Sequence, residues 1–157
     1  MAGINGITVT LYERVPNGTD DFNHTTYTET MVDIPDVMSE MFAFLALPKP
    51  SPIPAMRLEY QIAQKLHGAS APASKRAHDL IDLQLIMGAG AVDMRRTADL
   101  CRKLFRYRKV HEWPPTIVKG EKWESVYNYQ KGNLPVLPTI DEAVAWANEL
   151  IDKIDRA

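Results

Sequence analysis

The run from Leu80 to Met87 constrains the fold most, because on a helix its apolar side chains surround the axis on nearly every side. A helix of this kind is buried, so further elements must enclose it. Asp79 and Asp82 fall among these apolar residues. Burying an ionised carboxylate costs on the order of several kcal/mol unless it is paired. Each aspartate is therefore expected to have a cationic partner.

Lys65 is the candidate partner for both aspartates. It stands on the preceding predicted helix, at the border of the apolar face formed by Leu58, Ile62 and Leu66.

Lys75 and Arg76 place two cations at the predicted start of the next helix, where the helix dipole favours acidic residues. Two interpretations remain open. In the first, Ser74 is the N-cap and Lys65 or Arg76 completes a structural ion pair. In the second, an anionic ligand binds nearby.

The rest of the chain predicts an α+β fold in a single domain. Alternating residues from Ile7 to Leu11, a turn at Asn17-Gly18 and a Thr-rich run over residues 25–34 predict a β-hairpin or small antiparallel sheet. Residues 37–47 fit either a short helix or a strand. This β-rich part covers residues 1–47, an extended proline-rich connector residues 48–54, and a helical part residues 55–157. Four helices are expected, over residues 55–67, 74–88, 92–107 and 139–155.

Composition limits the class of protein. A chain of 157 residues has room for one core, and its net charge of -2 argues against a globally basic nucleic-acid binder. The single cysteine, Cys101, excludes an internal disulfide and is expected in the core. No tract approaches the roughly 20 apolar residues that span a bilayer. We expect a cytoplasmic protein without a membrane partner.

A stripe of cations on the third predicted helix is a candidate RNA contact, because Arg and Lys neutralise phosphates without reading sequence. The stripe comprises Arg95, Arg102, Arg106 and Lys109. Its alternative is an ordinary solvated face, in which Asp99 pairs with Arg95 or Lys103. Trp113 follows in a proline-stiffened loop, and either stacks on a base or covers the end of the core. Arg108 is expected past the helix end.

Several short motifs resemble the second half of the AbiEii/AbiGii nucleotidyltransferase-like toxin family. Its pattern E-x-x-I-A-x-K-L-x-A, then R-x-x-D-x-x-D-L, is similar to Glu59 through His67 followed by Lys75-Arg76, Asp79 and Asp82-Leu83. Further similar positions are Phe105 to Arg108, His111 to Pro115, Trp123 with Tyr127, and Thr139 to Val144. The resemblance runs from about residue 55 to the end of the chain.

The resemblance implies a polymerase-beta-like nucleotidyltransferase sheet followed by helices, and transfer of a nucleotide from an NTP, in some members to tRNA. It implies that Lys65, with Lys75 and Arg76, contacts the nucleotide, that Asp79 and Lys65 are catalytic residues, and that Asp82 and Arg76 support them. It also implies Mg²⁺ as cofactor, a cognate antitoxin as partner, and a bacterial toxin–antitoxin or abortive-infection role. The residues that would bind the metal are not identified by the sequence.

The chain departs from the family pattern in its N-terminal part. It has no Gly-Ser dipeptide and no Asp-x-Asp triplet, the motifs that hold metal ions in the family. We therefore expect a truncated or catalytically incomplete member with weak NTP binding. The alternative is a non-enzymatic module that binds protein or RNA, or forms a homodimer, through a sheet edge and the cationic stripe. A third reading is a gene model that begins too late, with both motifs upstream in frame.

Overall fold

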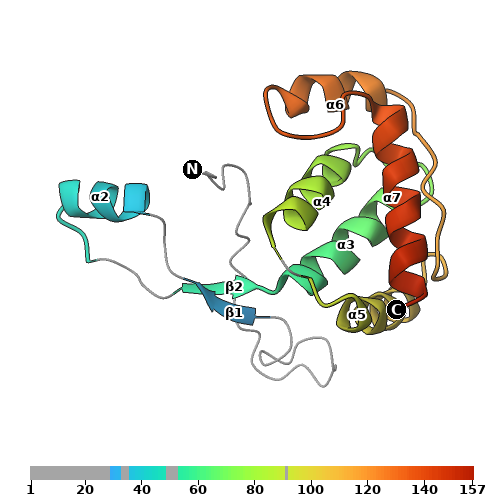
Figure 1. Cartoon of the computed structure of the whole chain (residues 1–157), viewed down its shortest axis with the longest axis horizontal. Coiled ribbons are helices and arrows are strands. Elements are labelled where there is room, and N and C mark those ends of the chain that lie inside the picture. Colours follow the sequence, from blue (N-terminus) through green and yellow to red (C-terminus); the bar gives the residue numbers. More distant parts are fainter. Residues whose placement is uncertain (1–28, 33–35, 49–52, 91) are drawn as a thin grey trace. The chain divides into compact units, whose positions relative to one another are not determined.

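The computed structural model describes residues 29–32, 36–48, 53–90 and 92–157. These residues belong to two compact units, which divide between Arg57 and Leu58. In the described part, six helices and two short strands make the chain mostly helical (Figure 1). This division lies just after the proline-rich connector predicted over residues 48–54.

The first unit contains a two-stranded antiparallel ribbon. Strand β1 (Glu29–Val32) pairs with β2 (Ile53–Met56), with Glu29 opposite Met56 and Val32 opposite Ile53. The predicted Thr-rich strand contains β1. The predicted strand from Ile7 to Leu11 lies outside the described residues, so the hairpin stays a prediction.

Two predictions in this unit need correction or refinement. The prolines were expected to prevent regular structure up to residue 54, yet Pro54 lies within β2. A strand tolerates proline when only one of its edges is paired, because the missing N–H can face the open edge. The ambiguous segment over residues 37–47 resolves as helix α2 (Asp36–Phe44), which buries none of its residues.

The second unit is a bundle of five helices among its described residues. These are α3 (Leu58–Ser70), α4 (His78–Ala89), α5 (Met94–Arg108), α6 (Trp123–Lys131) and α7 (Ile140–Asp155). Helix α3 packs against α4 and α5, while α7 packs against α4, α5 and α6 (Figure 1). This arrangement encloses α4.

Burial in α4 confirms the prediction made from its apolar residues. Leu80 and Leu83 are fully buried, and Ile81 and Ile86 nearly so. Cys101 on α5 is also fully buried, as predicted, and burial raises the pKa of its thiol to about 12. This cysteine is therefore a packing residue, since a thiol with such a pKa is not a nucleophile near neutral pH.

The helix ends agree only in part with the sequence signals. Thr139 and Glu142 form a capping box where the helix over residues 139–155 was predicted to begin. The prediction that Ser74 caps α4 is wrong, because α4 begins at His78 and Ala77 stands at its N-cap without a side-chain bond. Arg108 was also misplaced, since it is the last residue of α5.

Helix α6 was not predicted. Its N-cap residue is Lys122, in the left-handed region with φ 63°, and it makes no side-chain cap bond. The sequence therefore carries no conventional start signal for α6. Among the helices described, none has the length and apolar character needed to cross a membrane.

Candidate functional site

Lys65 and the two aspartates meet where α3 packs against α4. The Nζ of Lys65 lies 2.5 Å from Oδ2 of Asp82 and 3.5 Å from Oδ1 of Asp79. The three side chains come from two helices joined by a loop, so the contact depends on how those helices pack. The convergence predicted from the apolar pattern is present in the fold.

Arg76 completes the group from the loop before α4. Its Nε donates to Oδ2 of Asp79 at 2.5 Å and its Nη2 donates to Oδ1 at 3.2 Å. The hydrogen bond to Asp79 raises the pKa of the Arg76 guanidinium. We call Lys65, Arg76, Asp79 and Asp82 the Lys65 cluster.

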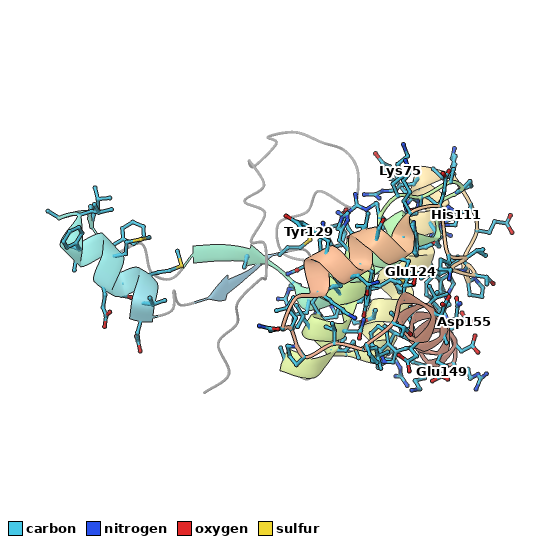
Figure 2. All side chains as sticks on the ribbon, turned by 90° about the horizontal axis from the view of Figure 1, so that it is seen from above. Lys75, His111, Glu124, Tyr129, Glu149 and Asp155 are labelled. Atoms are coloured by element: carbon cyan, nitrogen blue, oxygen red, sulfur yellow. The ribbon has the colours of Figure 1, made fainter. Side chains whose placement is uncertain are left out.

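The cluster spans the boundary between core and solvent. The Asp79 side chain is 0 % exposed, that of Lys65 20 %, and that of Arg76 53 %. Two cations balance two carboxylates, so the buried Asp79 has the cationic partners that a desolvated carboxylate needs. The neighbouring Lys75 is exposed and lies at the periphery of the helical unit (Figure 2). The cations thus form the outer side of the cluster.

Gly68 on α3 makes this close approach sterically feasible. A Cβ at this position would lie 2.7 Å from Nε of Arg76 and 2.9 Å from Oδ2 of Asp79. Any larger residue would push into the ion pair, so the absence of a side chain at Gly68 is part of the geometry of the cluster.

The cluster does not fit a magnesium ion as it stands. Within the described part of the chain, no group of three or more His, Cys, Asp or Glu side chains could hold a metal. Both oxygens of Asp79 already accept from Arg76, and Lys65 also contacts Asp79 Oδ1 and Asp82 Oδ2. Ligating a metal would require Lys65 or Arg76 to move.

The cationic stripe lies on an exposed face of α5, and its C-terminal part borders a pocket. Arg95, Arg102, Arg106 and Lys109 are all exposed. The pocket has a volume of ≈ 640 Å³ and is lined by Arg102, Phe105, Arg106, Lys109, Val110, His111, Glu112 and Trp113. Arg95 is not among the lining residues. The structure therefore joins three members of the stripe to the aromatic loop.

Some of this charge is already paired. Asp99 was expected to pair with Arg95 or Lys103, but it lies 3.7 Å from Arg102 instead. Nη2 of Arg102 also donates to the backbone oxygen of Asp155 at 3.0 Å. Arg106 and Lys109 are thus the better candidates for an anionic partner.

Trp113 takes the core-covering role considered for it, while stacking on a base stays a prediction. The side chain is half-buried, its ring meets Phe105 edge to face at 5.3 Å, and its Nε1 donates to Oδ1 of Asp155 at 2.8 Å. It covers the end of the core and also lines the pocket.

Sequence reasoning missed a histidine pair beside this pocket. The rings of His67 and His111 lie 4.8 Å apart, and Phe105 meets both edge to face. Nη1 of Arg108 contacts Nδ1 of His67 at 3.3 Å. Burial, followed by the charge of Arg108 and then His111, lowers the pKa of His67 to about 4. The sequence signal that could have indicated a buried histidine was the position of His67 directly after Leu66, a residue of the predicted apolar face.

Comparison with known proteins supports the resemblance found in the sequence. A family model described as "Nucleotidyl transferase AbiEii toxin, Type IV TA system" matches residues 20–151, which is most of the chain. The match includes the whole Lys65 cluster and the pocket beside α5. No curated protein matches the chain.

Proposed function

We propose, because the chain belongs to the AbiEii nucleotidyl transferase toxin family of type IV toxin–antitoxin systems, that the Lys65 cluster binds the phosphates of a nucleoside triphosphate. In this proposal Lys65 contacts the phosphates, with Lys75 and Arg76 beside it. Asp79 is the catalytic carboxylate that the family resemblance implies, and Asp82 holds Lys65 in place. Membership of the family also implies an antitoxin partner.

The observation that carries the proposal is the way Lys65 is held. An ammonium has three donor hydrogens, and only two acceptors from the cluster, Asp79 and Asp82, surround it. Within the described part of the chain, the cluster therefore leaves one donor for a phosphate oxygen, on a side chain that is 20 % exposed. Fixing a lysine by two carboxylates removes much of the entropy that ligand binding would otherwise cost.

We propose that this chain binds a nucleoside triphosphate but does not transfer the nucleotide efficiently. Metal-assisted phosphoryl transfer depends on carboxylates that fix divalent cations on the phosphates. The chain lacks both a Gly-Ser dipeptide and an Asp-x-Asp triplet, and the Lys65 cluster does not replace them. Transfer of a radiolabelled nucleotide to tRNA that disappears in Asp79→Ala would contradict this part of the proposal.

Lys65→Ala is expected to weaken binding of the Mg²⁺ complexes of ATP, CTP, GTP or UTP by about tenfold to a hundredfold. The reason is the loss of one charge-assisted hydrogen bond to phosphate. Isothermal titration of each nucleotide into wild type and variant measures the change.

Lys131→Ala is the matched control, because it removes a lysine whose ammonium contacts the backbone oxygen of Pro138 instead of the cluster. It should bind each nucleotide as wild type does. Unchanged affinity in Lys65→Ala, with measurable binding in wild type, would refute the site.

The second candidate function is binding of single-stranded RNA along the pocket beside α5. The observation that favours it is that one pocket is lined by Arg106, Lys109 and Trp113. Cations can follow a phosphate backbone while an aromatic ring stacks on a base, without reading sequence.

Arg106→Ala is expected to weaken binding of a fluorescent single-stranded RNA oligonucleotide and to reduce the salt slope of the affinity by about one. The physical reason is the loss of one neutralised phosphate. Fluorescence anisotropy at several salt concentrations measures both quantities. Lys153→Ala removes an exposed lysine of α7 and should change neither. Equal effects of both substitutions would leave only non-specific charge attraction and would argue against the pocket.

A further inference from the structure

The loop between α3 and α4 carries both Lys75 and Arg76, and Ser74 holds it at its centre. The Ser74 hydroxyl donates to the Gly68 oxygen at 2.8 Å and accepts from the Arg76 N–H at 3.2 Å. The Ser74 N–H donates to the oxygen of Ala71 at 3.1 Å. These bonds tie the loop to α3 on one side and to Arg76 on the other.

The remaining polar group of Ser74 is bound by a residue distant in sequence. Nε1 of Trp123, in the first turn of α6, donates to the backbone oxygen of Ser74 at 2.7 Å. Trp123 is 1 % exposed, so its indole is fixed by the surrounding core. A buried indole with a single N–H needs an acceptor, and this bond supplies it.

Glycine occupies the point where this contact is tightest. A Cβ on Gly120 would lie 2.6 Å from Nε1 of Trp123 and 2.8 Å from the oxygen of Ser74. With Gly68 beside the Arg76–Asp79 pair, a glycine stands at each end of the path from Trp123 to the cluster. The two glycines therefore allow the close packing of Trp123 on Ser74 and of Arg76 on Asp79.

We propose that Trp123 is a positioning residue for nucleotide binding: its indole N–H fixes Ser74, and Ser74 fixes the loop that presents Lys75 and Arg76 beside Asp79. The proposal rests on the proposed function, because it assigns these cations to the triphosphate. It adds α6, an element outside the cluster, to the machinery of the site. Helix α6 is suited to this role because it packs against α4.

Trp123→Phe tests the role, since it removes the N–H and keeps an aromatic ring. We expect it to weaken binding of Mg²⁺·ATP by about threefold to tenfold, the range that one lost hydrogen bond gives. Trp146→Phe is the matched control, because it makes the same change at a half-buried tryptophan of α7, whereas the indole that donates to Ser74 is that of Trp123. The control should bind Mg²⁺·ATP as wild type does.

A second readout does not require any ligand. The NMR signal of the Arg76 Nε–H reports its bond to Asp79, and it should shift or broaden in Trp123→Phe but not in Trp146→Phe. Gly120→Ala replaces Trp123→Phe in this experiment when the latter does not fold. It keeps the tryptophan, crowds the bond from Trp123 to Ser74, and is expected to have the same effect. An unchanged Arg76 signal in these variants, or an equal loss of affinity in both tryptophan variants, would overturn the positioning role. Should wild type bind no triphosphate, the proposed function fails and the Arg76 signal alone decides the role of Trp123.

Discussion

Replacing Lys65 by methionine is expected to lower the free energy of unfolding by about 3 kcal/mol at neutral pH. Methionine keeps the apolar stem and removes the charge, so the loss isolates the ammonium. It leaves the fully buried Asp79 with Arg76 and, 3.6 Å away, the imidazole of His78, and it leaves Asp82 without the ammonium that lies 2.5 Å from it. Breaking a buried ion pair costs more than a surface pair contributes, because the remaining charge stays desolvated.

Removing the buried carboxylate instead of the ammonium should lower the free energy of unfolding by less. Asp79→Asn removes the buried charge itself, while Lys65 retains Asp82 and the half-exposed Arg76 is hydrated. We expect a loss of about 1 kcal/mol, close to that of an ordinary hydrogen bond. Urea denaturation followed by tryptophan fluorescence compares both variants with wild type. A loss in Lys65→Met no larger than in Asp79→Asn would mean that the buried carboxylate does not depend on Lys65.

Acidification is expected to remove about 3 kcal/mol of stability through His67 alone. Its pKa is about 4 in the folded chain against 6.5 for an ordinary histidine. Above pH 6.5 His67 is neutral in both states and the full contribution is present. As the pH falls from 6.5 to 4, the unfolded chain binds a proton that the folded chain excludes, so stability is lost across this window.

His67→Gln provides the comparison, because glutamine keeps an acceptor for Arg108 and does not titrate. The free energy of unfolding measured at pH 7.5 and at pH 4 should fall further in wild type than in the variant, by about 3 kcal/mol. Groups remote from His67 titrate equally in both proteins and cancel in the difference. Parallel pH profiles would show that the His67 site is open to protons in the folded state.

The convergence of Lys65 with the aspartates was predictable from sequence because it depends on apolar periodicity. Buried neighbours fix which way Asp79 faces, and a buried carboxylate requires a cation. The capping box of α7 depends on local sequence, because Thr139 and Glu142 are only three residues apart.

The features that escaped prediction depend on tertiary contacts. The bond from Trp123 to Ser74 joins residues 49 apart in sequence, and nothing near Trp123 signals it. His67 and His111 likewise meet only because α3 packs against α5. Ser74 looked like an N-cap because serine favours that position, but its hydroxyl binds Gly68 instead.

Contact between the Lys65 ammonium and a nucleotide phosphate can be observed at the ammonium itself. The ¹⁵N signal of the Lys65 Nζ, assigned by its loss in Lys65→Ala, can be followed while Mg²⁺·ATP is added. We expect this signal to shift until the nucleotide saturates the chain, and we expect the Nζ signal of Lys131 not to shift. A Lys65 signal that stays unchanged while the chain becomes saturated with nucleotide would contradict it.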